Sequence, residues 1–149
     1  MATKSVHLVA ILLTAIALVP GGAHLFALPN KIGLGSEAYF TVQAIYLGWW
    51  MLGLVLIAAL VADAVLAIGL WGNQPASTLA IAALCLIAAN LAIFFIWTFP
   101  ANQATANWTV VPSNWEELRR NWEYSHAVNA FVTFMSLVCI TLAGLTART

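Results

Sequence analysis

The sequence predicts an all-α fold: an integral membrane four-helix bundle with an elaborated rim on one face. Three observations lead to this expectation, namely a scarcity of charge, four long apolar segments, and hydrophilic connections of unequal length. Hydrophobic residues make up 63% of the 149-residue chain and charged residues only 7%, whereas a soluble domain carries about 25% charged residues. Lipid is therefore the expected solvent for most of the surface, and the length allows a single transmembrane domain, residues 1–149.

Four segments are long enough to cross a bilayer, which takes roughly 20 apolar residues in a helix. The predicted helices cover about residues 6–28, 37–70, 76–99 and 114–145. Pro20 removes one backbone hydrogen bond from the first helix, and we expect that helix to continue through a kink. Pro100 is expected to stop the third helix. Ser113 and Glu116 fit a capping box at the start of the fourth.

The connections between these helices predict the rim. Residues 71–77 form a short turn, whereas residues 29–38 and 101–120 are longer. With four spans, the two longer connections must share one face of the membrane. The five basic residues are divided almost evenly between the two faces, which leaves the orientation open. We expect a location in the inner (plasma) membrane of a bacterium.

Polar side chains inside the apolar helices form two stripes, each with a 4-3-4-3 spacing that defines one helical face. The first stripe consists of Trp122, His126, Asn129, Thr133 and Ser136, and the second of Tyr39, Gln43, Tyr46, Trp50 and Gly53. Lipid cannot satisfy polar groups, so both faces are expected to point into the bundle.

Matching depths along the helices predicts one cavity that opens on the long-loop face. Its expected members are His24, Tyr46, Asn90, His126 and Asn129, with Trp49, Trp50, Trp97, Trp108, Trp115 and Trp122 around its mouth. Structural explanations stay open beside this one. Asn, Thr and Ser often serve only as interhelical hydrogen-bond donors and acceptors, and tryptophans near helix ends often anchor the protein at the interface.

Asp63 lies apart, in the second predicted helix toward the short turn. An uncompensated carboxylate in a membrane costs several kcal/mol. We expect the side chain to be protonated or paired, with His7, Thr14, Ser77 and Thr78 as the available partners. A proton-relay role is the alternative.

The candidate catalytic residues are His24, His126 and Glu123. Glu123 and His126 lie one turn apart, as in half of a di-iron bundle, but the first and third helices supply no further carboxylate. The two histidines could be axial ligands of a haem or part of a copper site, or one could act as a metal-free base.

Cys85 and Cys139 lie in apolar runs and are expected to be reduced packing residues. Because no spacing of the cysteines or histidines demands a metal site, we assign no metal ligands and keep haem or copper as an alternative.

Several stretches resemble a family of small four-helix membrane proteins. They are His24–Phe26 with Leu28–Ile32, Tyr39–Gln43 with Tyr46 and Trp49, Asn107–Thr109 with Pro112 and Asn114–Glu116, and Leu118–Ala127. This is a domain-of-unknown-function family related to the fungal anthrone oxygenases, and the similarity covers nearly the whole chain. Characterised relatives oxidise an anthrone carbon to a quinone with O₂ and without a cofactor. The resemblance implicates His24, Asn107, Trp108, Trp122 and His126.

The combined expectation is an anthrone oxygenase-like membrane protein that oxidises a lipophilic aromatic or quinol-type molecule with O₂, using a His base and no cofactor. The expected substrate-binding residues are Gln43, Tyr46, Trp50, Asn90, Asn107, Trp108, Trp122 and Asn129. Two alternatives remain: a non-catalytic subunit or scaffold of a larger membrane complex, and a haem- or copper-binding bundle. The expected partners are the lipid bilayer and a lipophilic small molecule, with a homo-oligomer or complex partner left open. The balanced charge gives no reason to expect nucleic acid.

Overall fold

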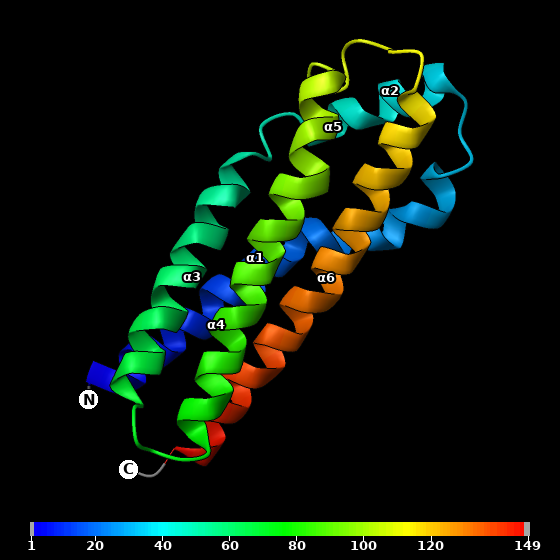
Figure 1. Ribbon diagram of the computed structural model, residues 1–149. Helices are drawn as coiled ribbons and strands as arrows, with labels where there is room; N and C mark the ends of the chain where they lie inside the picture. The colour runs from blue at the N-terminus through cyan, green and yellow to red at the C-terminus, as the bar shows by residue number, and fades with distance from the viewer. Residues whose placement is uncertain (1, 148–149) are drawn as a thin grey trace.

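The computed structural model describes residues 2–147, and four of its helices are long and apolar enough to cross a membrane (Figure 1). The spans are α1 (Ala2–Lys31), α3 (Met51–Gly69), α4 (Ala76–Ile93) with its continuation to Ala104, and α6 (Trp115–Thr146). No strand occurs in residues 2–147. The prediction of an all-α integral membrane bundle is confirmed.

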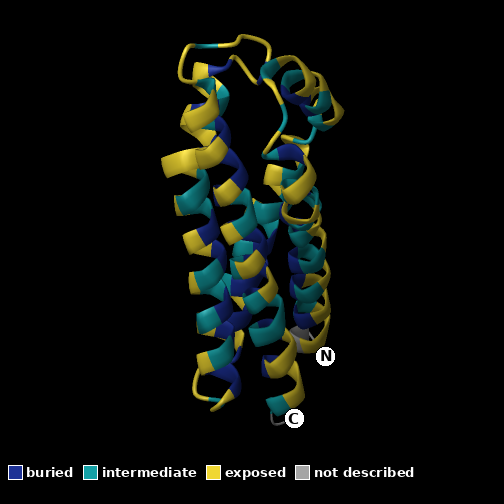
Figure 2. Ribbon diagram, turned by 90° about the vertical axis from the view of Figure 1, so that its right-hand side faces the viewer, coloured by how far each residue is buried: buried dark blue, intermediate teal, exposed yellow. Residues whose placement is uncertain are grey.

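The four spans form a ring in which each helix packs against two others. α1 packs against α3 and α6, and α4 packs against the same two helices from the other side. The outward faces carry exposed large apolar side chains, as suits contact with lipid (Figure 2). The interior near the chain ends is rich in alanine, including Ala10, Ala62, Ala80, Ala83 and Ala143. Small residues let membrane helices approach closely, so this half of the bundle is tightly packed.

The predicted continuous helix over residues 37–70 is wrong. The segment divides into α2 (Ser36–Gln43), a 3-10 turn (Ala44–Tyr46) and α3, which starts only at Met51. Gly48 lies at the break with φ of +88°, a left-handed conformation that glycine adopts without steric cost. The predicted stripe through Trp50 is therefore not one helical face, and Trp50 itself is 74% exposed.

The break leaves α3 much shorter than the helices around it. α3 has 19 residues, whereas α6 has 32. At the end of the bundle away from the chain termini, which we call the rim end, α2 and the turn after it take the place of a fourth helix (Figure 1). The rim predicted from the loop lengths is thus built by a short helix and an irregular segment.

Proline does not end the third span as predicted. The helix passes through a π-helical turn (Phe94–Thr98) and continues as α5 (Phe99–Ala104) with Pro100 in its first turn. Proline has no N–H to donate to the carbonyl four residues earlier, here that of Ile96, and its ring crowds that carbonyl. A π-helical turn directly before the proline widens the helix at this point. The prediction that the first helix continues through Pro20 is confirmed, because α1 runs unbroken past that residue.

The bounds predicted for the last helix agree with α6 to within one residue at each end. The predicted capping box is wrong, because Asn114 is the N-cap and no side chain caps the helix. Asn114 has φ of −98° and ψ of 24°, whereas a capping side chain usually belongs to a residue in the extended region. Ser113 lies one position too early to take that role.

α1 and α6 pass close to each other at Gly21. A Cβ atom at this position would lie 3.1 Å from both the Cα and the backbone nitrogen of Ala130. His24 follows Gly21 by one turn on α1, and His126 precedes Ala130 by one turn on α6. The glycine contact therefore sets the helix separation at which the two histidines meet.

The expected pairing of Asp63 is wrong. The side chain is fully buried, and neither carboxyl oxygen has a hydrogen-bond partner among residues 2–147. The proposed partners make other contacts or none: His7 bonds the Ile140 carbonyl, Thr78 donates to Gln74, and the hydroxyls of Thr14 and Ser77 are also without partners. Structural pairing therefore does not explain this carboxyl group.

We predict that Gly21→Ala lowers the stability of the protein by about 1–3 kcal/mol, the usual cost of overpacking a close contact. The added methyl group meets backbone atoms of α6, which cannot turn away as a side chain can. Gly22→Ala is the matched control, because a Cβ there has no neighbour within 4 Å. Thermal melts in detergent measure both, and equal melting temperatures for the two variants would contradict the close approach.

We predict that Asp63→Asn leaves the melting temperature unchanged or raises it. The substitution keeps the side-chain volume and breaks no hydrogen bond, because the carboxyl group makes none within the described chain. Ser136→Ala serves as the control, since it removes a buried hydroxyl that donates to the Ala83 carbonyl at 3.0 Å, and it should lower the melting temperature. A loss of about 3–5 kcal/mol in Asp63→Asn, the penalty for breaking a buried ion pair, would show a partner that the structure lacks.

Candidate functional site

A cavity of about 580 Å³ lies in the rim half of the bundle. Its volume falls within the range of roughly 300–1,000 Å³ that is usual for small-molecule sites. All four spans contribute to it, and the irregular segment 44–50 closes the side where α3 is missing. The predicted site residues that line it are His24, Gln43, Tyr46, Trp50, Asn90, Asn107, Trp108, Trp122, His126 and Asn129. Glu123 is the one predicted site residue that does not line it.

Two histidines from different helices stack against each other in this cavity. The ring centroids of His24 and His126 lie 4.2 Å apart, with the planes inclined by 35°. The indole of Trp122 meets both rings edge-on, at centroid distances of 4.6 and 4.4 Å. Trp122 and His126 share one face of α6 because they are one turn apart. The ring centroid of Tyr46 also lies 4.2 Å from that of His24, with the planes inclined by 58°.

A buried ion pair lies beside the histidines. Lys31 Nζ is 2.9 Å from Glu123 Oε1, and the two side chains are only 4% and 0% exposed. Tyr39 donates its hydroxyl hydrogen to the same carboxylate oxygen at 2.8 Å, and Gln43 Nε2 donates to the Tyr39 oxygen at 2.6 Å. This network ties α1, α2 and α6 together at the rim end.

Tyr39 lies outside the spanning helices, and its phenol stays protonated at neutral pH. Burial and, after it, the neighbouring Glu123 carboxylate raise the pKa of the Tyr39 hydroxyl above its ordinary value. Both effects disfavour a phenolate beside an anion. Because the pKa of Tyr39 is raised in the folded protein, the Tyr39–Glu123 bond stabilises the fold at every pH below the ordinary tyrosine range. It weakens only when the pH rises through the raised pKa.

Lys31 also reaches the histidine pair, a contact that the sequence analysis missed. Its Nζ lies 3.5 Å from His24 Nδ1 and above the rings of Tyr46 and Trp122, at 4.7 and 5.2 Å from their centroids. An ammonium group only donates, so Nδ1 must be the acceptor and His24 carries its proton on Nε2. The spacing of seven residues between His24 and Lys31, two turns on one face, was the available signal.

Asn102 fixes two of the aromatic walls. Its side-chain oxygen accepts hydrogen bonds from the indole nitrogens of Trp108 at 3.2 Å and Trp122 at 2.8 Å. Both indoles are therefore held in one orientation around the cavity. Asn102 belongs to α5, beyond the proline that was expected to end the helix, and the sequence analysis did not select it.

The loop after α5 holds three consecutive non-glycine residues in the left-handed region. Ala106, Asn107 and Trp108 have φ values of +46°, +55° and +65°, each costing on the order of 1–2 kcal/mol. The turn is held by hydrogen bonds from the Asn107 amide to the Asn102 carbonyl at 2.7 Å and from the Trp108 amide to Thr105 Oγ1 at 3.1 Å. Backbone strain of this kind is concentrated at functional sites, and here it places Asn107 and Trp108 against the cavity.

The side-chain amides of the cavity differ in whether their hydrogen-bonding groups have partners within the protein. Asn90 donates to Thr133 Oγ1 at 2.6 Å and to the Asn129 carbonyl at 3.4 Å, so it acts at least as an interhelical link. The side-chain oxygens of Gln43 and Asn129 are buried and have no partner within the described chain. Both residues line the cavity, and each of these oxygens keeps an unused capacity to accept a hydrogen bond.

The tryptophans expected at the cavity mouth do not all gather there. Trp49, Trp50, Trp108 and Trp122 line the cavity, whereas Trp97 and Trp115 do not. Trp97 lies in the π-helical turn and is 45% exposed. Trp115 packs instead beside Tyr39 and Phe40, at centroid distances of 6.2 Å from each.

The stacking of His24 and His126 argues against a haem held between them. Rings whose centroids are 4.2 Å apart are close to van der Waals contact, which is about 3.5–4.0 Å between carbon atoms. No porphyrin plane fits in that space. Within residues 2–147, no group of three or more His, Cys, Asp and Glu side chains is placed to hold a metal ion.

Fold and site together define an integral membrane helical bundle with a polar and aromatic cavity at one end. No protein-family model, curated protein or solved structure matches the chain. The resemblance to the anthrone oxygenases therefore rests on the sequence stretches alone and stays a prediction.

We predict that Glu123→Gln destabilises the protein by about 3–5 kcal/mol, because it leaves the buried Lys31 ammonium without a counter-charge. The double variant Lys31→Met with Glu123→Gln should recover most of that loss, since no buried charge then remains. Thermal melts of wild type, both single variants and the double variant form the cycle. Additive losses would show that the two side chains do not interact.

Proposed function

We propose that the protein is a membrane enzyme that oxidises a lipophilic aromatic or quinol-type molecule with O₂, as its resemblance to anthrone oxygenase-like proteins implies. The observation that supports this most is the stacked pair His24 and His126 in a cavity walled by tryptophan and tyrosine. A flat aromatic substrate would stack on such walls, and its polar oxygen atoms would meet the few hydrogen-bonding groups.

His126 is the proposed base. His24 Nδ1 faces the Lys31 ammonium, so its lone pair is not free to take a proton from a substrate. His126 has no hydrogen-bond partner among the described side chains and lines the cavity. A neutral imidazole in an apolar pocket can remove the acidic C–H proton of an anthrone-like carbon.

The proton on Nε2 gives His24 the complementary role. Removing the C–H proton places negative charge on the substrate's carbonyl oxygen, and a fixed N–H donor stabilises such an oxyanion. The Lys31 ammonium behind the imidazole adds positive charge on the same side. His24 and Lys31 are thus proposed to stabilise the enolate while His126 holds the proton.

The oxidation then balances with O₂ as the only oxidant. The enolate gives one electron to O₂, and the resulting carbon radical and superoxide combine to a peroxide anion. This anion takes back the proton held by His126 and becomes a hydroperoxide. Loss of water from the C–H hydroperoxide forms the new carbonyl group. In sum, one CH₂ group and one O₂ give one C=O group and one water, and the imidazole returns to its neutral form.

Substrate contacts follow from the groups left unpaired in the cavity. The amide oxygens of Gln43 and Asn129 would accept hydrogen bonds from phenolic hydroxyls of the substrate. Trp108 and Trp122, held by Asn102, would form its flat walls. Such a molecule partitions into lipid, in line with the proposed location in a bacterial inner membrane.

The scaffold alternative has less support. A non-catalytic subunit needs an outward surface for its partner and has no use for an internal cavity lined by unpaired amides and stacked histidines. A copper ion on His24 and His126 is the remaining cofactor alternative, and metal analysis of the purified protein with an absorption spectrum tests it directly.

We predict that His126→Ala lowers the rate of anthrone oxidation at least about a hundredfold, the usual contribution of a general base. Oxygen consumption and quinone absorbance of purified protein with an anthrone measure the rate. His7→Ala is the matched control, because His7 bonds the Ile140 carbonyl at the opposite end of the bundle and does not line the cavity. Its rate should stay at the wild-type value, and unchanged turnover in His126→Ala would remove that residue from the mechanism.

A further inference from the structure

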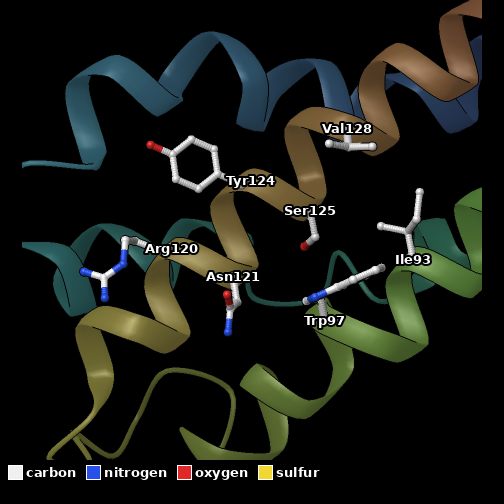
Figure 3. A pocket seen from close by; sticks show the side chains of 7 residues that line it. All are labelled: Ile93, Trp97, Arg120, Asn121, Tyr124, Ser125 and Val128. Carbon is white, nitrogen blue, oxygen red and sulfur yellow. The ribbon is translucent and has the colours of Figure 1, made fainter.

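A second hollow, independent of the cavity, lies on the outer surface between α6 and the helix formed by α4 and its π-helical turn (Figure 3). It has a volume of about 350 Å³ and is lined by Ile93, Trp97, Arg120, Asn121, Tyr124, Ser125 and Val128. None of these residues lines the cavity described above. We call this hollow the outer groove.

The floor of the outer groove is held by a direct link between its two helices. Ser125 on α6 and Thr98 in the π-helical turn share a hydrogen bond of 2.8 Å, and both side chains are buried. Ser125 is also bonded to the Trp122 carbonyl, one turn earlier, at 2.9 Å. The groove is thus a built feature of the helix contact, with Trp97 of the same π-helical turn as one wall.

The two ends of the outer groove differ in chemistry. Arg120 and Asn121 lie at one end, and Ile93 and Val128 at the other (Figure 3). Along α6, Arg120 and Val128 are eight residues apart, a distance of about 12 Å at the helical rise. Arg120 is close to the start of α6 at the rim end, so the polar end faces the membrane surface and the apolar end faces the bilayer interior.

The polar end carries unused hydrogen-bond donors. The Arg120 guanidinium, the Asn121 amide and the Tyr124 hydroxyl have no hydrogen bond or ion pair to any described residue. The exposed Glu116 and Glu117 lie one turn before Arg120 on α6, but neither forms an ion pair with it. A cation and two neutral donors therefore line this part of the groove without an acceptor among the described residues.

We propose that the outer groove binds a phospholipid with an anionic headgroup. The phosphate would accept hydrogen bonds from Arg120 and Asn121, because guanidinium groups suit phosphate oxygens. Trp97 and Tyr124 have the amphipathic rings typical of the headgroup level, and the first part of an acyl chain would lie along Ile93 and Val128. A free phosphate ion would leave this apolar half empty, which is why a lipid is the assigned occupant.

The test compares two lipids and one ion on the purified protein. Native mass spectrometry and thermal melts are recorded with phosphatidylglycerol, with phosphatidylcholine, and with inorganic phosphate. Wild type should bind phosphatidylglycerol in preference and melt at a higher temperature with it than with phosphatidylcholine, while phosphate alone should have no effect. Equal effects of both lipids, or an equal effect of phosphate, would overturn the proposal.

Three variants test whether phosphatidylglycerol binds at the outer groove. Arg120→Gln should lower the affinity for phosphatidylglycerol about tenfold, equivalent to about 1.4 kcal/mol, and the exposed Lys4→Gln at the other end of the bundle should leave it unchanged. Val128→Trp fills the apolar half while keeping Arg120, and it should also abolish the preference. If Val128→Trp binds as wild type does, the attraction is a surface charge effect and the groove is not the site.

Discussion

The arrangement at the rim end depends on the ion pair between Lys31 and Glu123. Removing an ammonium and a carboxylate from water carries a large desolvation cost, which is offset only by close contact and further hydrogen bonds. Here the carboxylate oxygen accepts from Lys31 and Tyr39, and Lys31 lies over two aromatic rings. The pair holds the end of α1 against α6, and the Tyr39 hydrogen bond attaches α2 to both. We call this ion pair with its Tyr39 bond the clamp. His24 lies two turns before Lys31 and His126 one turn after Glu123, so their stacking follows from this clamp.

The second constraint is the short α3. A bundle of four equally long helices would be filled by side chains along its whole length, as its alanine-rich half is. Because α3 starts only at Met51, the irregular segment 44–50 forms the fourth wall at the rim end. Irregular backbone is tolerated at membrane depth where it is buried in protein or lines a cavity. The site therefore occupies the place where regular packing stops.

Much of this could be predicted from local pattern. Composition and run length identify the spans, and the 4-3-4-3 spacing on α6 correctly placed Trp122, Asn129, Thr133 and Ser136 in the interior, where all four are buried. The same spacing failed in the second segment, because one Gly48 in an apolar run gives no sign that its φ is positive. The ion pair between Lys31 and Glu123 joins the first and last helices. Residues 92 positions apart in the sequence give no local pattern that would predict their contact. Asn102 was missed because a π-helical turn carries the helix past Pro100.

The clamp between the first and last helices also has a consequence for biogenesis. A chain is synthesised from its N-terminus, so α1 enters the membrane long before α6 exists. In that interval Lys31 has no counter-ion, and its flexible stem lets the ammonium stay at the water boundary. The cavity can close at the rim end only after α6 has inserted and packed against α1. A chain truncated before Glu123 would therefore hold its helices in the bilayer without ever enclosing a site.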